Sequence, residues 1–328
     1  MASADSDDGP VRAPGPEAEA VADLAAGVRA GLRGAVARAL NLVEDRRPEA
    51  RPAVAALLRE LGPGRTDGHR IGLTGPPGAG KSTLVSALAA TLSKKGHAVG
   101  VVAVDPSSKR SGGALLGDRV RIDGVTQDPG LFIRSLAAAG ELGGLARAAP
   151  AAVMVLAAAF ERVLVETVGV GQSETDVENV VDTVVLVVVP GSGDALQFLK
   201  AGIMEIPDVI VVNKSDLGDV ALRARADLLG VLGSARQSGV LAGAGPELLM
   251  VSAARKEGID DLAAALERHR RAQVETGALE ERRVRGSIEW GLRALARRVG
   301  EEGIEREGGW MAVRDRLEAQ VRSGRGNL

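Results

Sequence analysis

The stretch Gly75-Pro76-Pro77-Gly78-Ala79-Gly80-Lys81-Ser82 decides the fold, because it has the pattern G-x-x-x-x-G-K-S and follows the apolar run at 71–74. A strand that runs into such a turn can surround phosphates with backbone N–H groups, and the following helix directs its partial positive charge at them. We expect Lys81 to reach the β- and γ-phosphates, Ser82 to bind Mg²⁺, and Thr83 to lie at the nucleotide as well. A glycine-rich surface turn is the alternative, and the helical spacing of Leu84, Leu88 and Leu92 disfavours it.

A second motif indicates which base is bound. The apolar run at 208–212 leads into Asn213-Lys214-Ser215-Asp216, which has the pattern N-K-x-D. An aspartate carboxylate can accept hydrogen bonds from guanine N1–H and N2–H₂ together, and adenine has no such donor pair. We predict that Asp216 selects guanine, that Asn213 and Lys214 brace the loop, and that Ser252 and Ala253 belong to the last guanine-side loop. Taken alone, N-K-S-D is equally compatible with a polar turn, and its place after a phosphate loop favours the base-binding role.

Two acidic residues end predicted parallel strands. Asp105 follows the run at 98–104, and Glu166 follows the run at 162–165. Ligands of open α/β sheets bind at the carboxyl ends of the strands, and Mg²⁺ prefers a few carboxylates together with phosphate oxygens. We therefore predict that Asp105 and Glu166 hold Mg²⁺ directly or through its waters, and that Gly169, which has no Cβ, brings its N–H to the γ-phosphate. Each carboxylate could instead be an ordinary strand-end acid that faces water.

Five stretches together resemble the MeaB/ArgK-type G proteins, the GTPase chaperones of cobalamin-dependent acyl-CoA mutases such as methylmalonyl-CoA mutase. The residues that carry the resemblance are 72–83, 104–108, 111–121, 166–174 and 213–216. The run E-T-V-G-V-G-Q-S-E at 166–174 is the most specific, since Ras-like proteins usually have an aspartate at the position of Glu166. The resemblance reaches upstream through 32–44 and weakens after about residue 265.

The resemblance implies a GTPase that gates the delivery of adenosylcobalamin to an acyl-CoA mutase and protects the loaded enzyme. It also implies that the segment from Gly193 through Gln197, followed by Lys200, couples the nucleotide to the mutase. Terminal helices are implied to build a homodimer. The chain departs from the family at 137–139, where three alanines replace a pattern with a basic residue, and 156–160 is unusually rich in alanine; neither departure touches the predicted pocket.

The predicted site hydrolyses GTP by in-line attack of water on the γ-phosphate. Charge neutralisation by Lys81, Mg²⁺ and backbone N–H groups accounts for most of the catalysis, with turnover on the order of 10⁻⁴ to 10⁻² s⁻¹ without a partner. Gln172 lies three residues after Gly169 and either orients the water or supports the loop. Contacts of Gly169 and Asp105 near the γ-phosphate would hold the loops at 106–121 and 169–176 until hydrolysis.

Composition excludes several classes of function. The chain has 41 Lys+Arg against 43 Asp+Glu and a net charge of −2, so no basic field favours nucleic acid or an anionic membrane as a partner. The most apolar run, at 184–189, is too short to span a bilayer. The chain contains no cysteine, which excludes disulfides and is compatible with the cytoplasmic location that we predict.

The chain divides into four predicted parts: a disordered leader at 1–19, an N-terminal helical extension and linker at 20–68, a P-loop GTPase domain at 69–271, and a C-terminal helical dimerisation arm at 272–328. The GTPase domain is of the α/β class, with a mostly parallel sheet whose strands lie near 70, 98, 162, 183, 208 and 247.

Apolar stripes in the two terminal extensions need a surface to pack on, either the GTPase domain or a second copy of the chain. Two helices are expected in the N-terminal extension, one from Leu24 through Val43 and one from Val54 through Leu61. In the C-terminal arm, we interpret the arginines as a solvated helix face and the two tryptophans as packing anchors; these residues are Arg282, Arg283, Arg293, Arg297, Arg298, Trp290 and Trp310.

Three other functions stay open. A metallochaperone GTPase shares the fold but needs cysteine or clustered histidine ligands, and the histidines His69, His97 and His269 are widely separated in the sequence. A transport-associated kinase would transfer labelled γ-phosphate to a protein. A nucleotide-binding scaffold would release no phosphate in a hydrolysis assay.

Overall fold

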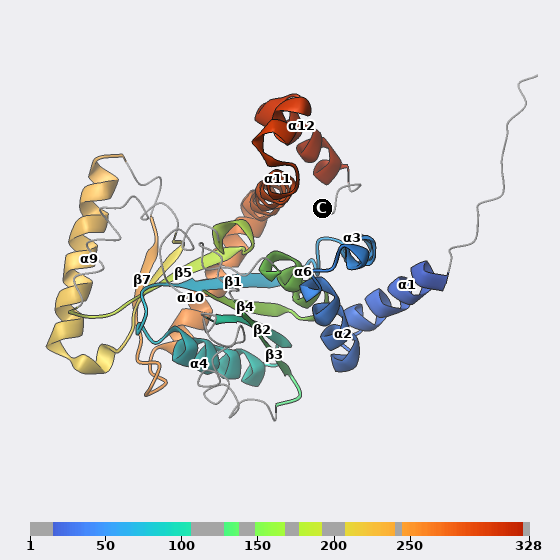
Figure 1. Cartoon of the computed structure of the whole chain (residues 1–328). Coiled ribbons are helices and arrows are strands. Elements are labelled where there is room, and N and C mark those ends of the chain that lie inside the picture. Colours follow the sequence, from blue (N-terminus) through green and yellow to red (C-terminus); the bar gives the residue numbers. More distant parts are fainter. Residues whose placement is uncertain are drawn as a thin grey trace, which may run out of the picture.

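The computed structural model describes residues 16–105, 128–137, 148–167, 177–191, 207–239 and 245–323. At its centre lies a seven-stranded sheet in the order β3-β2-β4-β1-β5-β6-β7, in which every neighbouring pair is parallel (Figure 1). The strands are β1 (His69–Thr74), β2 (Val99–Asp105), β3 (Leu131–Ala137), β4 (Arg162–Glu166), β5 (Thr183–Val188), β6 (Val209–Val212) and β7 (Glu247–Met250). The predicted α/β fold with a parallel sheet is confirmed.

Burial on both faces explains the sequences of the central strands. β5 and β6 are buried at every position, as is typical of parallel strands covered by helices on both sides. Strand β3 was not among the predicted strands. It lies at the edge of the sheet, and Arg134 in its middle pairs with Glu44 at 2.5 Å, so its apolar pattern is weak.

Helices cover the two faces of the sheet (Figure 1). The long helices of the described chain are α1 (Pro16–Arg29), α2 (Arg33–Glu44), α3 (Arg51–Leu61), α4 (Lys81–Lys94), α6 (Ala149–Ala159), α9 (Asp219–Gln237), α10 (Ile259–Thr276), α11 (Ala278–Arg306) and α12 (Gly309–Arg322). On one face, α4 and α10 join β1 in a buried cluster that includes Leu73, Leu84 and Leu262. On the other face, α1 to α3 and α6 form the second large cluster.

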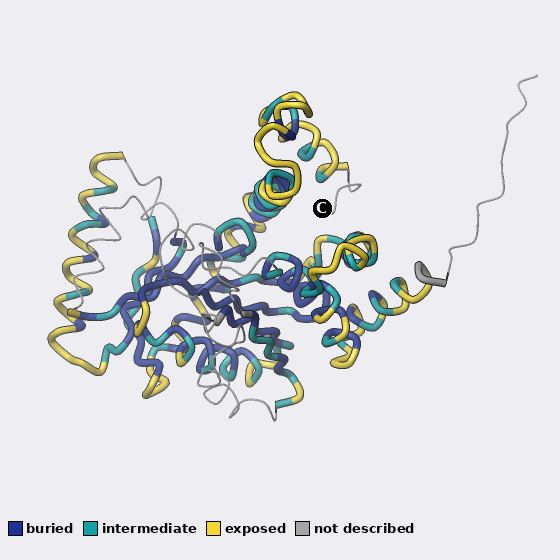
Figure 2. Tube along the Cα trace, in the orientation of Figure 1, coloured by how far each residue is buried: buried dark blue, intermediate teal, exposed yellow. Residues whose placement is uncertain are grey.

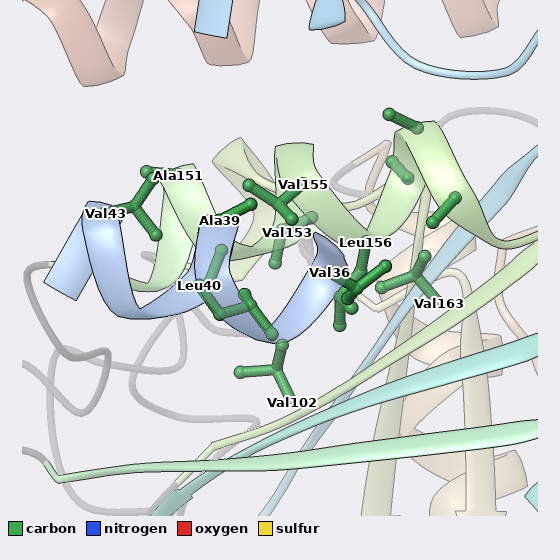
Figure 3. Packing of buried hydrophobic residues seen from close by; sticks show 14 of the residues in the cluster. Val36, Ala39, Leu40, Val43, Val102, Ala151, Val153, Val155, Leu156 and Val163 are labelled. Carbon is green, nitrogen blue, oxygen red and sulfur yellow. The ribbon is translucent and has the colours of Figure 1, made fainter. Parts of the chain in front are cut away.

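The apolar stripe of the N-terminal extension packs on the GTPase domain. Val36 and Leu40 of α2 lie in one cluster with Val102 and Val163 of the sheet, and the alanine-rich α6 packs beside α2 (Figure 3). Small side chains on α6 let the neighbouring helices approach closely, which gives the alanine-rich stretch at 156–160 a structural reason.

The N-terminal helices differ from the prediction in two ways. The structure divides the expected helix from Leu24 through Val43, because Gly31 has a φ of +69° and Leu32 is extended, so three long helices replace two. Helix α1 also begins at Pro16, inside the stretch that we predicted as a disordered leader.

The C-terminal arm begins beyond a continuous helix. α10 runs across the predicted boundary between 271 and 272 and ends at Gly277, whose φ of +74° separates it from α11. α11 and α12 then pack on each other around Ile288, Leu292 and Ile304. Figure 2 shows that exposed residues cover much of this hairpin and of α9. In the described part of the chain, no helix is both long and apolar enough to cross a membrane.

Two arginines of α11 do not form the solvated face that we predicted. Arg282 pairs with Asp208 at 2.9 Å and Arg283 pairs with Asp182 at 2.7 Å, and all four side chains are largely buried. Trp290 packs against the buried cluster formed by α1 to α3 and α6, as expected of an anchor. Trp310 is 45% exposed, which does not fit the packing anchor that we predicted.

Candidate functional site

The glycine-rich loop leaves the carboxyl end of β1, the strand that lies between β4 and β5. Gly75 has a φ of +138°, and a Cβ at this position would lie 2.2 Å from the carbonyl oxygen of Val187. Gly80 has a φ of +82°, and its Cβ would lie 2.6 Å from Nδ2 of Asn213. Both positions therefore require glycine, for conformation and for space. Pro76 and Ala79 are buried, whereas Pro77 and Gly78 of the loop and Thr83 in the first turn of α4 are exposed.

Lys81 and Ser82 begin helix α4 directly after the loop. The Lys81 ammonium donates hydrogen bonds to the carbonyl oxygens of Gly75 at 2.8 Å and Pro76 at 3.1 Å, and the side chain is 7% exposed. The Ser82 hydroxyl donates a hydrogen bond to Oε1 of Glu166 at 2.6 Å. The structure thus brings together a positive charge, a hydroxyl and a strand-end carboxylate where the helix begins.

The N-K-S-D loop contacts the glycine-rich loop directly. Nδ2 of Asn213 donates to the carbonyl oxygen of Ala79 at 2.8 Å, and Oδ1 of Asn213 accepts from the N–H of Ala253 at 3.1 Å. Lys214, with a φ of +57°, donates to the carbonyl oxygen of Gly78 at 3.0 Å. Through these hydrogen bonds the amide of Asn213 joins three loops at the carboxyl edge of the sheet. The residue is buried, with 2% of its surface exposed.

Asp216 stays exposed at the outer end of this arrangement. Its Oδ1 accepts a hydrogen bond from the Ser252 hydroxyl at 2.6 Å. This hydrogen bond holds the pKa of Asp216 below its usual range, so the carboxylate is ionised at neutral pH. An ionised, oriented carboxylate can accept two hydrogen bonds from a base that offers two neighbouring donors.

Several predicted site residues lie outside the described residues. These are Gly169, Gln172, the segment from Gly193 through Gln197, and Lys200. The backbone of Asp105 is described as the last residue of β2, and β2 pairs with β4 so that Ala103 lies opposite Glu166. Asp105 and Glu166 therefore stand at the same edge of the sheet, on neighbouring strands.

Two threonines complete this edge, and the sequence motifs did not single them out. Thr167 follows Glu166, its N–H donates to the carbonyl oxygen of Leu73 at 3.1 Å, and its hydroxyl donates to Oγ1 of Thr74 at 3.2 Å. Both threonines are 1% exposed. They hold the end of β4 against the end of β1. A polar residue directly at the end of an apolar strand is the sequence signal that could have identified them.

The histidines are closer in space than their sequence positions suggested. Oγ1 of Thr183 lies 2.7 Å from Nε2 of His69 and 2.8 Å from Nδ1 of His269, at the amino edge of the sheet. Burial lowers the pKa of His69 to about 3, so its ring is neutral. His69 and His269 are therefore far apart in the sequence but close in space. Among the described residues, no group of three or more His, Cys, Asp or Glu side chains could hold a metal ion.

The fold and the three cross-braced loops define the class of this chain, a P-loop nucleotide-binding protein. The chain belongs to the family described as "Methylmalonyl Co-A mutase-associated GTPase MeaB", which matches residues 36–306. The predicted family is confirmed, and the protein is a GTPase.

Known proteins resemble the chain over most of its length. A probable GTPase of Mycobacterium tuberculosis is 39% identical over 93% of this chain and 91% of its own, and the GTPase ArgK of Escherichia coli is 38% identical over 80% of each. A mouse protein named methylmalonic aciduria type A homolog, mitochondrial, is 35% identical over 79% of this chain and 65% of its own. A crystal structure titled LAO/AO transport system kinase covers 94% of each chain, with a TM-score of 0.67 and 29% identity.

Proposed function

We propose that this GTPase is a chaperone of a cobalamin-dependent acyl-CoA mutase, and that its bound nucleotide gates cofactor loading and protects the loaded mutase. The family description names methylmalonyl-CoA mutase, and the mouse relative carries methylmalonic aciduria in its name. Both names support a mutase as the partner. Gating of cobalamin is our extension of that support.

One observation carries the nucleotide part of the proposal. The buried amide of Asn213 joins the glycine-rich loop at Ala79 to the loop at Ala253 through bonds of 2.8 and 3.1 Å. A link of this kind fixes the distance between a phosphate end and a base end. We therefore assign 75–83 to the phosphates, and Asn213, Lys214, Asp216, Ser252 and Ala253 to guanine.

The oxygen atoms beside the phosphate loop fit a hard divalent cation. Ser82 Oγ and Glu166 Oε1 lie 2.6 Å apart, and Asp105 ends the strand next to β4. Hydroxyl and carboxylate oxygens are the ligand types that Mg²⁺ takes beside phosphates. We assign these residues to Mg²⁺, which neutralises phosphate charge when bound. Lys81 adds a second positive charge beside the phosphates. The γ-phosphate contact of Gly169 and the water-orienting or loop-supporting role of Gln172 stay predictions.

A homodimer is the second part of the proposed assembly. On α12, Trp310 is 45% exposed and Met311 is 80% exposed, and both line a depression of about 300 Å³ with Leu292 of α11. An exposed apolar patch on a terminal hairpin favours association with a second copy. In velocity sedimentation, we expect a dimer for the wild type and a monomer for Met311→Asp. A wild-type monomer would contradict this part.

The cytoplasmic location stays a prediction.

The test uses purified methylmalonyl-CoA mutase from the same organism. We expect its dissociation constant for this GTPase, and its rate of adenosylcobalamin uptake, to differ between GDP and a non-hydrolysable GTP analogue. Asp216→Asn is the control, because it should respond to xanthine nucleotides in place of guanine nucleotides. No association in any nucleotide state would contradict the proposal, and transfer of labelled γ-phosphate to protein would favour a kinase.

A further inference from the structure

The connection from β4 to β5 crosses the sheet from its carboxyl edge to its amino edge. Its described part, residues 177–182, contains the short helix η3 (Val177–Asn179) and is called the crossing segment here. The crossing segment lies between β1 on one side and α11 on the other. Its upstream end is separated by only nine residues, 168–176, from Thr167 at the nucleotide edge.

Two glycines leave space for the crossing segment. A Cβ at Gly72 of β1 would lie 2.5 Å from Cγ2 of Val177 and 3.0 Å from Cγ2 of Val181. A Cβ at Gly286 of α11 would lie 2.1 Å from the carbonyl oxygen of Asn179. Contacts this short do not occur between real atoms, so a side chain at either glycine would displace the crossing segment or the element that bears the glycine.

Buried charges fix the crossing segment to α11 at its downstream end. Asp182 is fully buried and accepts two hydrogen bonds from Arg283, at 2.7 and 2.8 Å, and one from the N–H of Arg70 at 2.9 Å. The side chain of Gln273 on α10 donates to the carbonyl oxygen of Asp182 at 2.9 Å. Because these donors come from β1, α10 and α11, movement of α11 relative to the sheet would break bonds that have no water to replace them.

We propose that Gly286 is a positioning residue for GTP hydrolysis, because its contact with Asn179 sets where the crossing segment stands and so links the nucleotide edge of the sheet to the arm formed by α11 and α12. Thr167 bonds the nucleotide-edge end of this connection to β1, and Asn179 at the other end packs closely against Gly286 of α11. The stretch between these anchors includes Gly169 and Gln172. In this proposal a shift at Asn179 acts on GTP hydrolysis along the chain that contains these two predicted residues, and the phosphate and base loops are untouched.

Because the same connection joins the two places, we expect the bound nucleotide to act on α11 as well. Trp290 is a natural reporter, because it lies one turn after Gly286, is partly buried, and lines a common cavity with Asn179, Val180 and Asp182. Trp310 is the other tryptophan of the chain and lies on α12. In a Trp310→Phe protein, the fluorescence of Trp290 reports the packing of α11 on the crossing segment.

The first experiment compares Gly286→Ala with Gly230→Ala. Gly230 lies in exposed α9, and a Cβ added there would meet no atom within 4 Å, so it controls for adding alanine to a helix. We expect Gly286→Ala to lower kcat for GTP by about fivefold or more, the lower end of typical couplings, with KM and GDP affinity unchanged. Gly230→Ala should match the wild type. Equal kcat values for Gly286→Ala and wild type would overturn the proposal.

The second experiment does not depend on the folding of Gly286→Ala. Trp310→Phe protein is titrated with GDP and with a non-hydrolysable GTP analogue in the presence of Mg²⁺, and the emission of Trp290 is recorded. We expect the two nucleotides to give different emission maxima or intensities at saturation. Identical emission in both states would overturn the proposal even if Gly286→Ala were impaired. Neither experiment uses a mutase, so the result stands apart from the proposed chaperone function.

Discussion

Replacing Asn213 by alanine removes the amide that joins the phosphate loop to the base loop. The amide makes two hydrogen bonds, at 2.8 Å to Ala79 and 3.1 Å to Ala253, and the residue is 2% exposed. Each partner left unsatisfied in a buried place costs about 1–3 kcal/mol, so the substitution loses roughly 2–6 kcal/mol of loop organisation. Because a bound nucleotide needs both loops in register, we expect most of this loss to appear in nucleotide affinity.

Isothermal titration with GDP measures the loss. The lower limit of about 2 kcal/mol corresponds to a dissociation constant weakened by about 30-fold. Asn41→Ala is the matched control, since the Asn41 amide accepts a single exposed hydrogen bond from Arg134 at 2.8 Å. The control should bind GDP as the wild type does. A GDP affinity for Asn213→Ala within threefold of wild type, in protein with an unchanged melting temperature, would refute the assigned bridging role.

Lys81→Ala should abolish GTP turnover and weaken triphosphate binding by roughly 10- to 150-fold, because a charge-assisted contact contributes about 1.5–3 kcal/mol; phosphate release and titration measure both. Asp216→Asn should weaken GTP binding and strengthen xanthosine triphosphate binding, and unchanged discrimination between the two would exclude Asp216 as the base reader. The pKa of His69 is lowered from 6.5 to about 3 in the folded chain. Between these two pH values the unfolded chain binds a proton at His69 and the folded chain does not. Stability is therefore complete above about pH 6.5 and falls as the pH approaches 3, by at most about 1.4 kcal/mol per pH unit. Urea unfolding at pH 7 and pH 5 measures this slope, and His69→Gln should flatten it.

The sequence predicted those features that depend on local pattern. The strand before Gly75 and the helix after Lys81 follow from an apolar run, a glycine-rich turn and the spacing of leucines. The parallel direction of the strands could be anticipated because strands alternate with helices along the chain. The contact between Asn213 and Ala79 was also within reach, since both motifs end strands at the same edge.

Features that depend on long-range packing could not be predicted in this way. β3 was missed because an edge strand with Arg134 in its centre lacks a continuous apolar run. The division of the first N-terminal helix at Gly31 was hidden by apolar residues that keep helical spacing on both sides of the glycine. Arg283 looks like a surface residue in sequence, and only the position of Asp182 at the start of β5 makes it a buried partner.

Asp216 and Asp182, at opposite edges of the sheet, differ in burial, and the burial of Asp182 restricts how α11 can move. At the carboxyl edge, Asp216 is exposed and has capacity to accept further hydrogen bonds. At the amino edge, Asp182 is buried and saturated by donors from β1 and α11. Removing one partner of a buried ion pair costs about 3–5 kcal/mol, so α11 cannot leave Asp182 during ordinary fluctuations. Because Asp182 also bonds to β1, we expect a push on α12 to act on the crossing segment through the contact between Gly286 and Asn179, and not by displacing Asp182.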